Sequence, residues 1–112
     1  MTDKYILQGK APVKASLGEW AEWYETADRH VAKSGSQSKM SNKPFVSTVF
    51  LGLDHSFGRP GAPILFETMI FGGEHDQYQD RCSTWDEAEA MHTKACELAG
   101  LKSPFARRET IK

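Results

Sequence analysis

The fold is decided by residues 45–71, which read FVSTVFLGLDHSFGRPGAPILFETMIF. Apolar residues alternate with period two over Phe45–Asp54 and again over Ile64–Phe71, a pattern typical of β-strands. Both sides of the first segment are apolar, which predicts a central strand. The nine residues His55–Pro63 between them contain two glycines and two prolines and form a loop. Two adjacent strands joined in this way most simply pair antiparallel.

A helix is expected on each side of this strand pair. Ser16 and Glu19 have the spacing of a capping box, in which each residue satisfies a free N–H of the other. Apolar residues follow at steps of three and four, so we expect a helix over Leu17–Lys33. Thr84 and Glu87 repeat the capping-box spacing and open a second helix with its own apolar stripe.

Shorter strands complete the expected fold. Tyr5–Leu7 is a short β-run followed by a turn, which predicts a small hairpin or a bent strand. Gln77–Cys82 predicts a further short strand, whereas the Ser- and Lys-rich segment Ser34–Lys43 has no periodicity and predicts a loop. The order is therefore β-α-β-β-(β)-α. The expected class is α+β, a small antiparallel sheet of three to four strands with two helices packed on one face.

Composition limits the class of protein further. The chain has 112 residues, 39% of them hydrophobic, which suits one domain over residues 1–101 and a flexible basic tail over residues 102–112. The net charge of −1 argues against nucleic acid as a principal partner. No apolar run reaches the roughly 18 residues of a membrane helix, and the N-terminus lacks the layout of a signal peptide. We therefore expect a cytoplasmic protein with no membrane association.

Three titratable residues near the central loop are candidates for acid–base catalysis: Asp54, His55 and Glu67. A strand that ends in Asp-His at a loop presents both groups at the rim of a sheet, where imidazole can move protons near neutral pH. Glu67 lies in the middle of a predicted strand and could face His55 across the hairpin, where burial would raise its pKa. The alternatives are that Asp54 caps the loop, that His55 is a solvated turn residue, and that Glu67 lies on an exposed face.

Aromatic and basic side chains supply candidate ligand contacts, namely Trp23, Arg29, His55, Phe57 and Arg59. Aromatic rings interleaved with cations can stack on a ligand and hold its phosphates. The alternative is that the aromatic residues belong to the core. Trp23 lies off the predicted apolar stripe of its helix and is therefore the aromatic residue without an obvious buried position.

Metals and cofactors are not expected. The four histidines show no HxH or HxxxH spacing, and the two cysteines fit no zinc or redox spacing. His30 and His92 are expected on the surfaces of their helices. Cys96 falls among alanines in the second helix and is expected to be a buried thiol.

Four stretches carry a family resemblance: residues 23–31 (WYETADRHV), 47–58 (STVFLGLDHSFG), 65–73 (LFETMIFGG) and 83–89 (STWDEAE). Together they resemble a set of small accessory proteins encoded by tailed phages and prophages. The resemblance covers roughly Tyr5 to Leu98 and supplies no catalytic residue. It implies an accessory role in the cytoplasm of an infected host cell.

The leading hypothesis is stoichiometric binding of a host protein or a small ligand, because no catalytic signature is present. The first alternative is a small nucleotide-directed hydrolase that uses Asp54, His55 and Glu67. The second is a weak nucleic-acid binder that uses the lysines of residues 33–43, the tail and Trp23. The sequence leaves the oligomeric state open.

Overall fold

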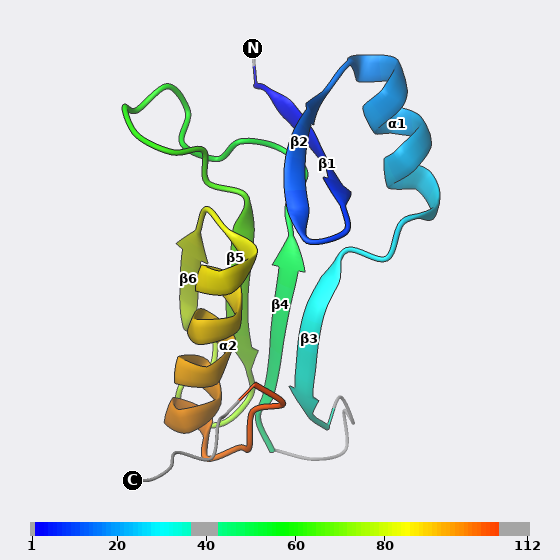
Figure 1. The fold of residues 1–112 in the computed structure, drawn as a ribbon. Helices are drawn as coiled ribbons and strands as arrows, with labels where there is room; N and C mark the ends of the chain where they lie inside the picture. Colours follow the sequence, from blue (N-terminus) through cyan, green and yellow to red (C-terminus); the bar gives the residue numbers. More distant parts are fainter. Residues whose placement is uncertain (1, 37–42, 106–112) are drawn as a thin grey trace, which may run out of the picture.

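The computed structural model describes residues 2–36 and 43–105 and confirms the α+β class, with two helices and two antiparallel sheets (Figure 1). The elements in chain order are β1 (Lys4–Gln8), β2 (Ala11–Ala15), α1 (Leu17–Thr26), β3 (His30–Gly35), β4 (Phe45–Phe50), β5 (Phe66–Phe71), β6 (Gln79–Cys82) and α2 (Trp85–Ala99). Within the described residues, neither helix is long and apolar enough to cross a membrane.

The larger sheet has the strand order β3-β4-β5-β6, and every pair in it is antiparallel. The expected pairing of the two central strands is present, with Thr48 opposite Thr68 and Phe50 opposite Phe66. Helix α2 packs along one face of this sheet (Figure 1). The core between them is made of completely or almost completely buried apolar residues: Val46, Phe50, Leu65, Phe66, Ile70, Ala88, Met91, Ala95 and Cys96.

The smaller sheet is the hairpin β1–β2, against which α1 packs (Figure 1). Gly52 joins this unit to the end of β4, because its carbonyl accepts the N–H of Tyr5 at 2.9 Å and the indole N–H of Trp20 at 3.0 Å. Lys4 forms an isolated antiparallel bridge with Leu53. The hairpin is thus held against the segment that leads into the central loop.

The expected packing of both helices on one face of a single sheet is not found. Helix α2 covers the four-stranded sheet, whereas α1 lies on the hairpin. The order is also different from expectation, β-β-α-β-β-β-β-α. Two segments account for the different order. Gly9, with φ +64, lets Lys4–Gln8 and Ala11–Ala15 pair as a hairpin, which was one of the two forms expected there, and His30–Gly35 is an additional strand.

The expected helix over Leu17–Lys33 is wrong in its second half, since α1 ends at Thr26. The cap residue Ala27 is extended (φ −76, ψ 143), and the Asp28 carboxylate accepts the N–H of His30 at 3.1 Å in a turn. β3 then pairs with β4 over a segment that had been expected to be helix and loop. The rest of the expected loop, residues 37–42, lies outside the described residues.

The local signals at the helix ends are confirmed. Both expected capping boxes are present, at Ser16 with Glu19 and at Thr84 with Glu87. Gly100 ends α2 in the left-handed conformation at φ 76. Cys96 is buried, as expected, and both cysteines are free.

His92 is completely buried, which contradicts the surface position expected for it. Its Nε2 lies 2.8 Å from the Ser34 hydroxyl, and its Nδ1 lies 2.8 Å from the Thr48 hydroxyl. Thr48 in turn bonds the Thr68 hydroxyl on the next strand. A polar chain therefore crosses three strands beneath α2 with each ring nitrogen of His92 paired. Phe105, in the tail, packs edge-on against the His92 ring at 5.8 Å between centroids.

Candidate functional site

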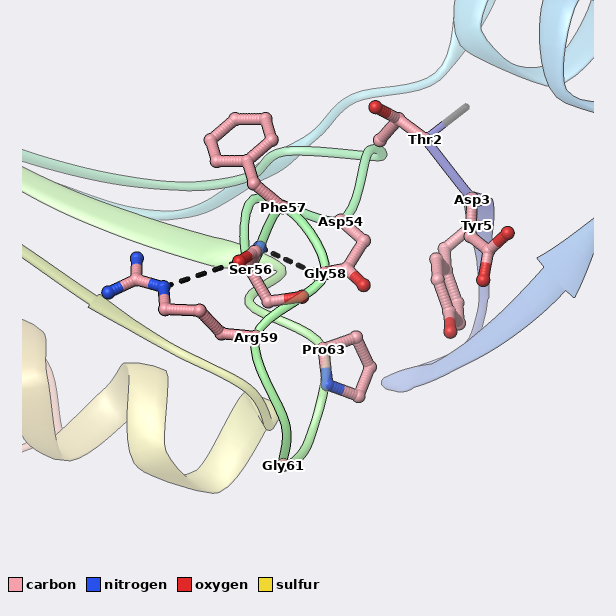
Figure 2. A pocket seen from close by; sticks show the side chains of 10 residues that line it. All are labelled: Thr2, Asp3, Tyr5, Asp54, Ser56, Phe57, Gly58, Arg59, Gly61 and Pro63. Carbon is pink, nitrogen blue, oxygen red and sulfur yellow. Dashed lines mark hydrogen bonds between the residues drawn. The ribbon is translucent and has the colours of Figure 1, made fainter.

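A hollow of about 580 Å³ lies between the start of β1 and the loop that follows β4. Figure 2 shows the side chains that line it. Its lining residues are Thr2, Asp3, Tyr5, Asp54, Ser56, Phe57, Gly58, Arg59, Gly61 and Pro63. The volume is in the range of small-molecule pockets, and the lining comes from segments about 50 residues apart in the sequence.

Asp54 organises the loop side of the hollow. Its Oδ1 accepts the backbone N–H of Ser56 at 2.8 Å and of Ile64 at 3.0 Å, so one oxygen ties the two ends of the loop together. Partial burial acts to raise the pKa of Asp54, but the hydrogen bonds from Ser56 and Ile64 outweigh it and hold that pKa below its usual value. Asp54 therefore carries a negative charge at neutral pH. Among the described residues its second oxygen has no hydrogen-bond partner.

Phe57 is presented to solvent at the rim of the hollow, with 70% of the residue exposed. Its φ of +52 is a left-handed conformation that bulky residues rarely adopt. The ring lies 5.5 Å from the ring of His55, centroid to centroid, and the turn is closed by the Arg59 N–H on the Ser56 carbonyl at 3.1 Å. Phe57 thus combines an unfavourable backbone conformation with a ring that is exposed to water. Strained residues of this kind are concentrated at binding and active sites.

The charges of the hollow are mainly acidic. Arg59 donates through Nε to the Ser56 carbonyl at 3.3 Å, and its side chain extends away from the space between the loop and β1 (Figure 2). Asp3 stands on the opposite wall, where its Oδ2 lies 3.3 Å from the Lys14 ammonium on β2. Lys14 offsets the charge of Asp3, so Asp54 is the carboxylate that contributes most to the negative potential in the hollow.

The three candidate catalytic residues are held by different partners. The Nδ1–H of His55 donates to the Leu53 carbonyl at 2.9 Å. The Glu67 Oε2 accepts from Arg81 Nε at 2.9 Å and from Gln79 Nε2 at 2.7 Å. Within the part of the chain described, no hydrogen bond joins Glu67 to His55 or Asp54. Asp54 performs the loop-capping role that was the alternative for it.

Glu67→Gln is expected to lower the free energy of unfolding by no more than about 1 kcal/mol, because the partner Arg81 is substantially exposed and such pairs contribute little. Gln retains an oxygen that can accept from Arg81 or Gln79. Urea unfolding of both proteins measures the difference. A loss of several kcal/mol would mean instead that Glu67 is a buried, indispensable carboxylate.

Among the candidate ligand contacts, the structure brings Phe57 and Arg59 to the hollow, whereas His55 contacts Phe57 but is not part of the lining. Trp23 and Arg29 lie elsewhere. Trp23 is partly buried and packs edge-on against Phe50 at 5.7 Å between centroids, which is the core position that was the alternative for it.

Arg29 is also engaged in holding the fold together. Its guanidinium lies 4.4 Å from the centre of the Tyr24 ring and donates to the Phe50 carbonyl at 3.0 Å. Residues 106–112, in the tail that was a candidate for nucleic-acid contact, lie outside the described residues.

Sequence reasoning missed the β1 side of the hollow, formed by Thr2, Asp3 and Tyr5. Their position depends on the Asp54 N–H, which bonds the Asp3 carbonyl at 3.1 Å, and on the bond between Tyr5 and Gly52. Such long-range pairing leaves no local sequence signal. The one available indication was the short polar N-terminal run before a β-segment.

No group of three or more His, Cys, Asp or Glu side chains that could hold a metal ion is found in residues 2–36 and 43–105. The hollow offers two carboxylates, a phenol, an exposed aromatic ring and a loop closed by backbone hydrogen bonds. In comparisons with known proteins, no family model, no curated protein and no solved structure matches this chain.

Proposed function

We propose that the protein is a non-catalytic binding protein that takes up a small ligand, or a side chain of a host protein, in the hollow beside Asp54. The observation that carries the proposal is the hollow itself, about 580 Å³ in volume, with Phe57 held exposed at its rim. In this proposal the protein acts as a phage-type accessory protein in the cytoplasm of the infected cell, in keeping with the resemblance of its sequence.

Hydrolysis is the weaker proposal on geometric grounds. A general acid–base pair needs the reacting groups within hydrogen-bond reach of one another or of a shared substrate atom. One oxygen of Asp54 accepts two loop N–H groups, and Glu67 accepts from Arg81 and Gln79. Of the three candidates, Asp54 alone lines the hollow. Binding requires no such convergence.

Nucleic acid is a poor match for the hollow. Phosphate binding depends on lysine and arginine directed at the ligand. The one arginine of the lining, Arg59, is directed away, and two carboxylates remain (Figure 2). A polyanion would be repelled there.

Native mass spectrometry of the full chain, before and after incubation with whole bacterial extract, tests the proposal. We expect a stoichiometric adduct on the wild type. In Phe57→Asn its occupancy should fall about tenfold, because aromatic contacts of this kind contribute about 1–2 kcal/mol to binding. Asn tolerates the left-handed conformation better than Ala, so the loop should keep its shape.

Leu17→Ala is the matched control, because Leu17 is also an apolar residue that is 65% exposed, but it lies on α1 outside the lining of the hollow. It should leave the adduct unchanged. An adduct that survives Phe57→Asn, or the absence of any adduct from extract, would contradict binding in the hollow.

A further inference from the structure

The chemistry of the hollow restricts what it can bind, provided that the proposed binding function holds. Asp54 is anionic at neutral pH, and one of its oxygens has no partner among the described residues. Its carboxylate points into the space between the loop and β1 (Figure 2). A ligand that enters this space therefore meets an available acceptor that carries charge.

The other wall already binds a cation. Asp3 Oδ2 holds the Lys14 ammonium at 3.3 Å, and both side chains are well exposed, so this contact can be exchanged at low cost. Tyr5, two residues after Asp3 at the start of β1, contributes an aromatic ring to the lining. An ammonium or guanidinium group that enters the hollow would thus meet the Asp54 carboxylate, with Asp3 on the opposite wall.

The remaining walls suit an organic cation better than a metal ion. Tyr5, Phe57 and Pro63 present apolar and aromatic surface that can cover the methylene groups and attract the positive charge through the ring faces. Ca²⁺ and Mg²⁺ prefer six or more oxygen ligands. Two carboxylates in a hollow of about 580 Å³ form a poor cage for a bare ion but have room for a chain that carries one.

We infer that the hollow between β1 and residues 54–63 is a binding site for an organic cation, a primary ammonium or guanidinium group on an aliphatic chain. Asp54 and Asp3 contact the charge, and Tyr5 and Phe57 contact the chain. The source is a free polyamine or a lysine or arginine side chain of a partner protein. The two sources share this chemistry and are separated by the test.

The test is a titration of the isotopically labelled full chain, followed by amide NMR. The cationic probes are 1,5-diaminopentane and a blocked Arg-Gly-Arg peptide; 1,5-pentanediol and glutarate are the neutral and anionic probes of matched length. We expect the amide resonances of residues 2–5 and 54–63 to shift and saturate with the cationic probes but not with the diol or glutarate. The dissociation constant should rise with salt concentration. Saturation by the diamine at lower concentration identifies a free amine as the ligand, and saturation by the peptide identifies a protein side chain.

Asp54→Asn should weaken the binding of the cationic probe at least about tenfold, since it removes the charge but keeps an oxygen that can accept from Ser56 and Ile64. Unchanged amide positions at those two residues verify that the loop is intact. Asp86→Asn is the matched control and should not weaken binding, because it removes the same charge from an exposed position on α2, outside the lining of the hollow.

Several results would overturn the inference. They are equal binding of the diol or glutarate, equal affinity in Asp54→Asn, saturation by Ca²⁺ or Mg²⁺ at lower concentration than the diamine, and no saturation by either cationic probe. If neither cationic probe saturates but an adduct from extract shifts the same amides, the proposed binding function stands and the inference of a cationic ligand is wrong. No adduct and no shift would remove both.

Discussion

His92→Ala is expected to lower the free energy of unfolding by about 3–5 kcal/mol, the largest effect of any single polar side chain in the described structure. The ring is completely buried beneath α2 and is hydrogen-bonded at both nitrogens, to Ser34 and to Thr48. Its removal leaves a cavity and deprives both hydroxyls of a partner in a region that excludes water. The cost of the cavity and the cost of the lost hydrogen bonds both lower the free energy of unfolding.

Urea unfolding followed by far-UV circular dichroism measures this loss. Lys94→Ala, on the exposed face of the same helix, is the matched control and should change stability by less than about 0.5 kcal/mol. A loss below about 1 kcal/mol in His92→Ala would show that water or neighbouring side chains replace the histidine without penalty.

The pH dependence of the stability difference between wild type and His92→Ala tests whether the buried, neutral imidazole is its cause. Burial lowers the pKa of His92 from its ordinary value of 6.5, because the charged imidazolium is the form that desolvation penalises. The groups bonded to its ring are hydroxyls, from β3 and β4, and the tail packs Phe105 on it; none of these carries a negative charge. The unfolded chain therefore takes up this proton more readily than the folded chain.

This difference in proton uptake fixes the direction in which the stability contribution of His92 changes with pH. The stability that His92 contributes is fully present above about pH 6.5 and is lost as the pH falls below that value towards the lower pKa of the folded state. The difference in unfolding free energy between wild type and His92→Ala should therefore shrink as the pH falls below about 6.5. A difference that grows on acidification would mean that the buried imidazole is protonated in the folded state.

Local signals predicted much of this fold, and long-range contacts account for the errors. The capping residues Ser16 and Thr84 and the alternation of the two central strands depend on neighbours in the sequence, so they could be recognised. Val31 kept the helical spacing of the expected first helix. It lies instead on β3 against the core, because the edge of β4 offers backbone partners that the sequence alone does not reveal.

The residue spacing in α2 indicates a buried position for His92, although a surface position had been expected. His92 follows Ala88 by four residues and precedes Ala95 by three, which is the spacing of the buried face. What the spacing could not reveal is that Ser34 and Thr48 lie opposite to receive it. The loop side of the hollow was partly recognised through Asp54, Phe57 and Arg59, since turn chemistry is local.

The hairpin side of the hollow depends on one glycine, and Gly52→Val is expected to destabilise the protein by about 3 kcal/mol. Gly52 has φ +80, which is unfavourable for any side chain and most of all for a β-branched one. A Cβ at this position would lie 2.9 Å from Tyr24 Cε1 and 3.2 Å from Trp20 Nε1. The clash falls where α1 and the hairpin meet the end of β4, so the variant should push this unit away from the four-stranded sheet.

The loss of docking should be visible at the hollow as well as in stability. Asp3 and Tyr5 are held beside the loop by the backbone bonds from Tyr5 to Gly52 and from Asp54 to Asp3. In Gly52→Val the amides of residues 2–5 and 54–56 should therefore shift and ligand binding should disappear. Gly18→Ala is the matched control: it lies in α1 with no atom within 4 Å of an added Cβ, and it should gain up to about 1 kcal/mol from helix propensity. If Gly52→Val left the hollow intact while it lowered stability, the hairpin would be anchored by its other contacts, and the strain would be confined to the turn. If both properties were unchanged, the contact of Trp20 and Tyr24 with this glycine would be too loose to hold the two sheets together.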